Sequence, residues 1–221
     1  MHYRSLLRYI PGLAVAASLL LAGPAHASVI GHWSFDEPFD GVGDYFDTEL
    51  NLDQLDGSFT AEAIARYDGA ANRIWTPLLG SSHGPAFDSD EIFFIGKHDG
   101  NNDLNINIGG LDSFSFSSGG FFDGDLHLVA VVYDQAQSEI RTYVDEQLIH
   151  TQPGITGSVT GSSLLRIGGT GHDPDERWPG LINEVRFSSE VLGPGQFIPE
   201  PGTLGILGLG ALALMRRRRR P

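Results

Sequence analysis

The clearest pattern in the chain is a pair of runs rich in β-branched and aromatic residues, at 126–133 and 139–145, on either side of Asp134-Gln135-Ala136-Gln137. Two such runs around a short polar break predict an antiparallel hairpin. The first run is apolar at nearly every position, as in a strand covered on both faces, whereas the second alternates more clearly. The pattern therefore predicts an inner hairpin of a two-layer β-structure.

Further segments have the alternation and the flanking turns that are typical of strands, at 58–67, 73–79, 91–96, 104–108, 113–117, 164–169 and 180–187. Turns rich in Gly, Asn, Asp and Ser separate them, and no segment before the C-terminal tail has a convincing helical period. By contrast, residues 36–57 are acidic and Gly-rich, and we expect them to form a long surface loop. Many short strands with regular turns predict a single all-β sandwich or jelly roll.

Several motifs also resemble a known family. The stretches HLVAVVYDQAQSEIRTYVDEQLI, LLRIGG and WPGLINEVRF occur in the order of the closing half of a laminin-G-like domain, and VIGHWSFDE and GSFTAEAIARY resemble its earlier strands. The resemblance implies a concanavalin A-like (LamG-like) jelly-roll β-sandwich over residues 28–197. Three positions depart from the family pattern: Ile64 stands for a Trp, Glu146 for a turn Gly, and Asn183 for an Asp. The last departure weakens any metal site that the resemblance implies.

The first 27 residues have the features of a signal peptide. Arg4 and Arg8 precede an apolar stretch at 10–23, and Ala25 and Ala27 form an A-x-A cleavage site. The alternative, a membrane anchor that is kept, needs a longer apolar run. We therefore predict export and a mature chain from residue 28. Because the chain has no cysteine, its stability must come from packing or from metal binding.

The C-terminal residues 198–221 form a second recognisable element. A short apolar run at 202–215 ends in five arginines, including Arg216, Arg217 and Arg218. This predicts a short transmembrane helix with its basic end in the cytoplasm. Together with Pro199, Glu200 and Pro201, the arrangement resembles the PEP-CTERM sorting signal of Gram-negative bacteria.

That resemblance implies a defined route for the protein. The chain is held transiently in the inner membrane, an exosortase cuts near the Pro-Glu-Pro motif, and the domain reaches the cell surface or the extracellular space. Signal peptidase and an exosortase are then its processing partners. A permanent tail anchor is the alternative.

The charge of the mature region narrows the range of partners. Residues 28–200 contain seven Lys and Arg against all 28 Asp and Glu of the chain, a net charge of −21. Such a surface repels nucleic acids and anionic polymers and attracts divalent cations. The acidic stretch at 36–57 is the best candidate for structural Ca²⁺, and the family resemblance pairs Asp36 with Glu184 as ligands. A solvated acidic surface is the alternative.

No catalytic motif is evident. The chain lacks the E-x-D-x-E type of carboxylate pair expected of a sandwich-fold glycoside hydrolase, an H-E-x-x-H helix and a thiol nucleophile. Its histidines are scattered without metal-ligand spacing. We therefore predict that the protein is not an enzyme.

Binding is the remaining hypothesis. Jelly rolls of this type commonly hold glycans or proteins through aromatic rings and Asp or Asn side chains. The candidate residues are Trp75, Trp178, Phe121, Phe122, Asn101 and Asp103. Trp178 could instead be a packing residue, and Phe121 and Phe122 could plug one end of the sandwich. The partner is then a polysaccharide or a surface protein. The alternative function is a structural or adhesive envelope protein whose self-association depends on Ca²⁺ and which has no specific glycan site.

Overall fold

The computed structural model describes residues 28–35, 37–40, 44–69, 75–81, 92–98, 102–171 and 176–198. The predicted signal peptide, the Pro-Glu-Pro motif and the predicted transmembrane helix lie outside these ranges. Within them, no helix has the length and apolar character needed to cross a membrane.

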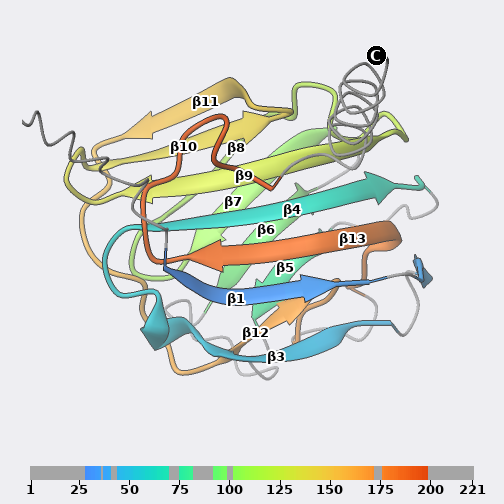
Figure 1. Cartoon of the computed structure of the whole chain (residues 1–221), viewed down its shortest axis with the longest axis horizontal. Coiled ribbons are helices and arrows are strands. Elements are labelled where there is room, and N and C mark those ends of the chain that lie inside the picture. Colours follow the sequence, from blue (N-terminus) through green and yellow to red (C-terminus); the bar gives the residue numbers. More distant parts are fainter. Residues whose placement is uncertain are drawn as a thin grey trace, which may run out of the picture.

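Two antiparallel sheets pack face to face (Figure 1), which confirms the predicted all-β sandwich. The seven-stranded sheet has the order β1-β13-β4-β9-β10-β11, with β2 paired to β13: β1 (Val29–Ser34), β13 (Pro179–Ser188), β4 (Phe59–Tyr67), β9 (Leu126–Asp134), β10 (Glu139–Val144), β11 (Gln147–Pro153) and β2 (Phe39–Asp40). The six-stranded sheet has the order β3-β12-β5-β6-β7-β8: β3 (Phe46–Asn51), β12 (Leu164–Ile167), β5 (Trp75–Ser81), β6 (Phe93–His98), β7 (Asp103–Ile108) and β8 (Asp112–Ser117).

The predicted hairpin is confirmed as β9 and β10, with Glu139 opposite Asp134 and Val144 opposite Val129. The two faces of β9 belong to different apolar clusters. Val129 and Val131 face the core between the sheets, whereas Leu128 and Val132 face outward into a second cluster. This explains why the sequence of β9 is apolar at nearly every position.

The second cluster is built by residues 189–198, which we call the strap. After β13 the strap turns back and crosses the outer face of β4 and β9 (Figure 1). Its Leu192, Phe197 and Ile198 are buried against that face. The covering segment follows the last strand, so the pattern of β9 alone could not show what covers it.

The prediction of a surface loop at 36–57 is wrong. This stretch contains β2, β3 and a 3₁₀ turn (Leu52–Gln54), and β3 forms the edge of the six-stranded sheet. Thr48 and Leu50 are buried while Asp47 and Glu49 are exposed. The alternation has a period of two, but acidic outward positions and a threonine at one inward position give it little apolar signal.

Strand β11 was not predicted from the sequence. It follows β10 through a two-residue turn in which Asp145 (φ 50°) and Glu146 (φ 64°) both have positive φ. Two-residue hairpin turns of this kind favour Asn-Gly or Asp-Gly. Glu146 adopts this positive φ where the family pattern has a glycine, and its Oε1 accepts a hydrogen bond from the Gly195 N–H of the strap (3.1 Å).

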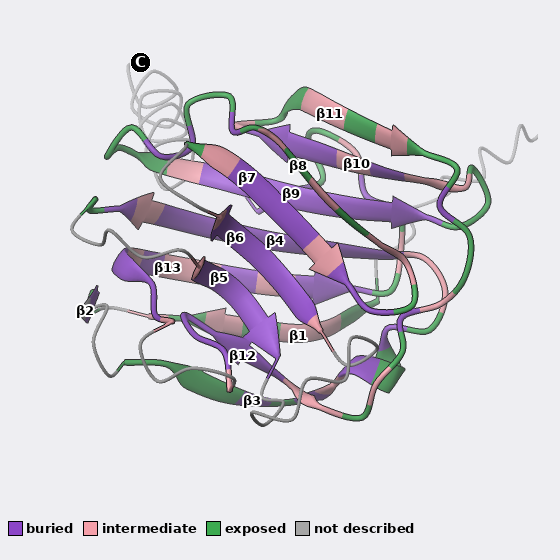
Figure 2. Cartoon of the chain, turned by 180° about the vertical axis from the view of Figure 1, so that it is seen from behind, coloured by how far each residue is buried: buried purple, intermediate pink, exposed green. Residues whose placement is uncertain are grey.

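Burial is greatest in the centre of both sheets and falls off at the edge strands β3 and β11 (Figure 2). The sandwich has two open sides, where edge strands of the two sheets lie next to each other. On the β8–β11 side the rings of Phe116 and His150 stack with centroids 4.2 Å apart. On the β1–β3 side a groove of about 460 Å³ remains.

Candidate functional site

The outer face of the six-stranded sheet carries the predicted ligand residue Trp75. Phe93 and Ile95 of β6 belong to the core between the sheets. Because successive side chains of a strand point to opposite faces, Phe94 and His98 lie on the outer face. Trp75 is paired with His98, so its side chain lies on that face as well.

Strand register brings four side chains into one row across β5 to β8, which we call the Trp75 row: Trp75, His98, Asp103 and Ser117. The pairs Trp75–His98 and Asp103–Ser117 are direct cross-strand partners. Lys97 of β6 is opposite Leu104 of β7, so His98 comes beside Asp103. The structure thus unites two predicted ligand residues that are far apart in the sequence.

The row combines a ring surface with polar groups. The rings of Trp75 and His98 are stacked at a tilt of 32° with centroids 3.8 Å apart, and Phe94 supports the indole edge-on at 5.2 Å. Trp75, His98 and Asp103 are half-buried and Ser117 is exposed. A supported indole beside a carboxylate and a hydroxyl group can stack on a sugar ring and hydrogen-bond to its hydroxyls.

Next to this row, strands β7 and β8 carry a group of polar side chains. Asn105 is opposite Ser115, and Asn107 is opposite Ser113. Asn105 is only 4% exposed, and its Nδ2 donates to Ser115 Oγ (2.8 Å) and Phe114 O (3.2 Å). In the part of the chain that the structure describes, its Oδ1 has no hydrogen-bond partner. A buried acceptor without a donor is costly, and this oxygen is too deeply buried in this structure to contact a ligand.

The other predicted aromatic residues do not belong to this site. Trp178 and Phe121 are fully buried and Phe122 is 7% exposed. Together with Tyr67 they form a ring cluster inside one end of the sandwich, and Trp178 Nε1 donates to Arg66 O (3.2 Å). The expectation that they form a ligand platform is wrong: Gly119 (φ 63°) and Gly120 (φ 102°) turn the chain, and the two phenylalanines that follow pack inward.

The remaining predicted ligand and metal residues are only partly described. Asn101 and Asp36 lie outside the described ranges, as do the processing residues Ala25, Ala27, Pro199, Glu200, Pro201, Arg216, Arg217 and Arg218. Glu184 accepts a hydrogen bond from His32 Nε2 at 2.6 Å. Among the described residues, no group of three or more His, Asp or Glu side chains comes together to hold a metal ion. The pairing of Asp36 with Glu184 stays a prediction.

The groove between β1 and β3 is the second hollow surface. It is lined by Ile30, Gly31, His32, Trp33, Phe46, Asp47, Glu49, Leu50 and Gln54. The indole of Trp33 lies over Gly31, where a Cβ would meet the ring at 2.1 Å. Asp47 is held by Arg166, with Oδ1 2.6 Å from Nε. The groove thus has a mixed polar and apolar lining, in which the carboxylate of Asp47 is already paired with Arg166.

A histidine clamp fixes the start of β9. His127 Nδ1 is 2.7 Å from Asp145 Oδ2, and its Nε2 is 2.9 Å from Asp123 Oδ1. Burial by itself lowers the pKa of His127, but the hydrogen bonds to Asp123 and Asp145 outweigh it and raise the pKa above 6.5. Both carboxylates are engaged in backbone hydrogen bonds too, so the clamp is a structural tie between the β10–β11 turn and the loop before β9.

Sequence reasoning missed His98 and Asn105. Neither belongs to a motif, and only the register of β5 to β8 brings them beside Trp75 and Asp103. The alternation in 104–108 did indicate that Asn105 and Asn107 share one face. The strand order is needed to tell whether this is the outer face and which residues lie beside it.

Comparison with known proteins identifies the family of the domain. Residues 40–196 match the model of the concanavalin A-like lectin/glucanases superfamily, and residues 197–220 match the model of the PEP-CTERM protein-sorting motif. No curated protein matches the sequence.

Several solved structures share the fold. A point mutant of the NanB sialidase of Streptococcus pneumoniae is 16% identical, with a TM-score of 0.57 over 78% of this chain and 28% of the sialidase. The CBM40 module of the Ruminococcus gnavus IT-sialidase, bound to α2,3-sialyllactose, is 13% identical with a TM-score of 0.58, covering 76% of this chain and 96% of the module.

Domain 4 of AbnA, an extracellular GH43 arabinanase of Geobacillus stearothermophilus in complex with arabinotriose, is 15% identical with a TM-score of 0.52. The match covers 77% of this chain and 96% of that domain, whereas this chain spans little more than a quarter of the NanB sialidase. Because the first family model covers well over half of the sequence, the protein belongs to the concanavalin A-like lectin/glucanases superfamily and ends in a PEP-CTERM sorting motif.

Proposed function

We propose that the protein is an exported, non-catalytic carbohydrate-binding module that acts at the cell surface or in the surrounding exopolysaccharide. The observation that carries the proposal is the Trp75 row, in which the supported indole of Trp75, then His98, Asp103 and Ser117 follow one another across β5 to β8 on the outer face of the six-stranded sheet. Two of the similar structures are modules bound to oligosaccharides, which supports the choice of ligand class. The sorting motif supports export and processing by an exosortase.

The chemistry of the row favours an uncharged saccharide. The carboxylate of Asp103 can accept hydrogen bonds from sugar hydroxyls. The mature region has a net charge of −21, which repels acidic glycans at low salt. Neutral hydroxyl-rich polysaccharides therefore fit the site better than uronate- or sialate-containing ones.

The absence of a catalytic constellation within the described residues is consistent with binding, although the carboxylates at 88, 90, 91, 173 and 175 lie outside them. Glu176 is described, and its Oε2 accepts a hydrogen bond from Thr170 Oγ1 (2.5 Å). In the described part of the sandwich, no facing carboxylate pair stands beside the Trp75 row. Binding without turnover is the function that this geometry supports best.

The test is a binding assay with a panel of neutral and acidic polysaccharides, using wild type, Trp75→Ala and a matched charge pair. Asp103→Asn removes the carboxylate of the row, and Asp53→Asn removes an exposed carboxylate in the 3₁₀ turn. We expect Trp75→Ala and Asp103→Asn each to weaken binding roughly tenfold or more, and Asp53→Asn to leave it unchanged. Equal binding by all variants would contradict the proposal. Self-association that follows Ca²⁺, with no glycan bound, would support the adhesive envelope function instead.

A further inference from the structure

The strap binds the seven-stranded sheet through a built apolar contact. Leu192, Phe197 and Ile198 pack with Ile64 and Leu128, and with the neighbouring Ala130, Val132 and Tyr143. The rings of Phe197 and Tyr143 lie with centroids 5.2 Å apart. Phe197 and Ile198 are only 4% and 2% exposed. The end of the strap is therefore as buried as a core strand.

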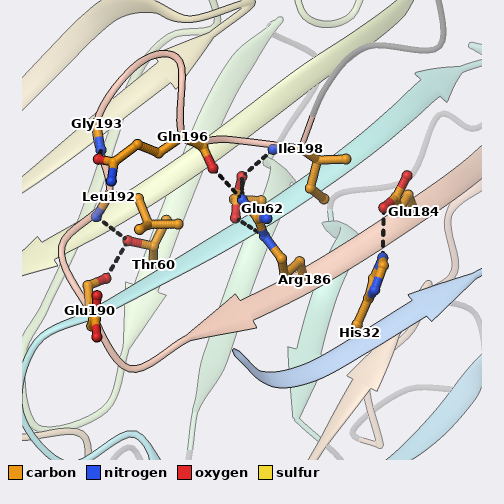
Figure 3. Close-up of polar contacts among 10 residues, drawn as sticks. All are labelled: His32, Thr60, Glu62, Glu184, Arg186, Glu190, Leu192, Gly193, Gln196 and Ile198. Carbon is orange, nitrogen blue, oxygen red and sulfur yellow. Dashed lines mark hydrogen bonds and ion pairs between the residues drawn. The ribbon is translucent and has the colours of Figure 1, made fainter. Parts of the chain in front are cut away.

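Polar contacts fix the backbone of the strap at two places (Figure 3). At its start, Thr60 Oγ1 donates to Glu190 O (2.7 Å) and accepts from the Leu192 N–H (3.0 Å). At its end, Glu62 Oε1 accepts from the Ile198 N–H (2.8 Å). Each of these three bonds joins a side chain of β4 to a backbone group of the strap, so they hold the backbone while the apolar contact holds the side chains.

A buried ion pair lies under the end of the strap. Glu62 is fully buried, and Arg186 grips it with Nε at 2.6 Å from Oε2 and Nη2 at 2.9 Å from Oε1. Arg186 Nη2 also donates to Gln196 O (2.7 Å). The pair thus binds the strap through both partners. Burial of this kind is costly unless the polar groups are satisfied, and here the strap supplies one donor to Glu62 and one acceptor to Arg186.

The strap also overlaps the sorting signal. The match to the sorting motif begins at residue 197, so Phe197 and Ile198 belong both to the motif and to the apolar contact with β4, β9 and β10. In the sequence they directly precede the Pro-Glu-Pro motif. No linker separates the folded domain from the segment that a processing enzyme must bind.

We propose that the outer face of the seven-stranded sheet is a docking site for the leading residues of the sorting signal, and that residues 190–198 must leave it before the signal is processed. This inference rests on the proposed function in one respect, which is that the protein is sorted through its C-terminal motif. Processing breaks one peptide bond and transfers the acyl group to water or to an amine acceptor. The enzyme must hold the backbone upstream of that bond, and here Glu62 and Arg186 hold it already.

Docking therefore competes with processing for the same backbone groups. When a segment opens and closes quickly, its cleavage follows the fraction of molecules in which it is open. A tightly docked strap lowers the rate of processing, and a weakened one raises it.

The experiment compares two valines that are neighbours on β9 and equally buried. Val132 contacts the strap, whereas Val131 faces the core between the sheets. Val132→Ala and Val131→Ala remove the same atoms from the same strand, so both destabilise the domain, but only Val132→Ala loosens the docking site. Neither change alters the strap or the sorting motif. The full chain is produced in its natural host, and conversion of the precursor to the processed form is followed by pulse-chase labelling and immunoblotting.

We expect Val132→Ala to speed processing roughly three- to tenfold over wild type, and Val131→Ala to change it by less than about twofold. Hydrogen exchange of the purified variants should show faster exchange at the Leu192 and Ile198 amides in Val132→Ala alone. Thr60→Val, which removes both bonds at the start of the strap, should act like Val132→Ala.

Equal rates for both valine variants, whether raised or unchanged, would overturn the proposal, because processing would then follow global unfolding or no opening at all. Glycan binding should be the same in both, since the Trp75 row lies on the other sheet. Failure of the docking inference is therefore distinguishable from failure of the binding function.

Discussion

The two sheets have different outer faces. The outer face of the seven-stranded sheet presents Leu128, Val132 and a buried ion pair, and the strap covers it. The outer face of the six-stranded sheet presents Trp75, His98, Asp103 and a row of serines on β8. The strap covers the first face. The second combines exposed serines with the half-buried side chains of Trp75, His98 and Asp103. The difference indicates that an external partner binds the six-stranded sheet. Substitutions on the two faces test this.

The largest expected effect is at the ion pair under the strap. Glu62→Ala leaves Arg186 without its main partner and the Ile198 N–H without an acceptor. We expect the free energy of unfolding to fall by about 4 kcal/mol, as measured by urea denaturation. Burial raises the pKa of Glu62 despite the opposing bonds from Arg186. Glu62→Gln keeps one of the two acceptor oxygens, so it should cost less than Glu62→Ala. Glu49→Ala, at an exposed carboxylate of β3, is the control and should change stability by less than about 0.5 kcal/mol. If Glu62→Ala also lowered the free energy of unfolding by less than about 0.5 kcal/mol, the strap would not be held at Glu62.

Truncating one aromatic ring on each face compares the faces directly. Phe197→Ala removes a buried ring from the strap and should lower stability by about 3 kcal/mol. Trp75→Ala removes a half-buried ring from the open face and should cost about 1 kcal/mol, because solvent already reaches the indole. Thermal unfolding of both variants measures the difference. Similar losses would show that Trp75 is a packing residue and not a binding platform.

A smaller effect is expected at the β10–β11 turn. Glu146 has φ 64° and binds the Gly195 N–H. Glu146→Ala loses the bond and keeps the strained backbone, whereas Glu146→Gly loses the bond and relieves the strain. The glycine variant should therefore be about 1 kcal/mol more stable than the alanine variant. An alanine variant as stable as the glycine one would mean that the turn relaxes to a negative φ.

The smallest effect is the pH dependence from the histidine clamp. The pKa of His127 is raised above 6.5 by Asp123 and Asp145, against the lowering effect of burial. A raised pKa means that the folded state binds the proton more tightly, so the stability from the clamp is complete below pH 6.5 and is lost as pH rises through the folded pKa. His127→Gln should flatten this part of the stability profile, as followed by denaturation midpoints across the neutral range. If the slope of stability against pH were unchanged in His127→Gln, a group other than His127 would be responsible for it.

The sequence predicted the fold well because most strands carry local signals. The hairpin at 126–145 and the strands at 58–67 and 180–187 alternate or are apolar throughout, and flanking Gly and Pro mark their ends. Edge strand β3 was not predicted because it buries few side chains. For the same reason its acidic residues looked like a loop.

The candidate site was predicted only in part. Trp75 and Asp103 were named from their residue types, but Phe121, Phe122 and Trp178 were named for the same reason and are buried. Residue type and local polarity do not determine which way a ring points after a glycine turn. His98, Asn105 and the docking of the strap depend on contacts between distant segments, and those follow from the strand order.

The most direct test of the central claim is a calorimetric titration of the purified protein with neutral polysaccharides, comparing wild type with Trp75→Ala and Asp103→Asn. We expect saturable binding by wild type to at least one neutral glycan, and a loss of about 1.4 kcal/mol or more of binding free energy in each variant, with folding preserved. If both variants bound that glycan as tightly as wild type, the outer face of the six-stranded sheet would not be the binding site.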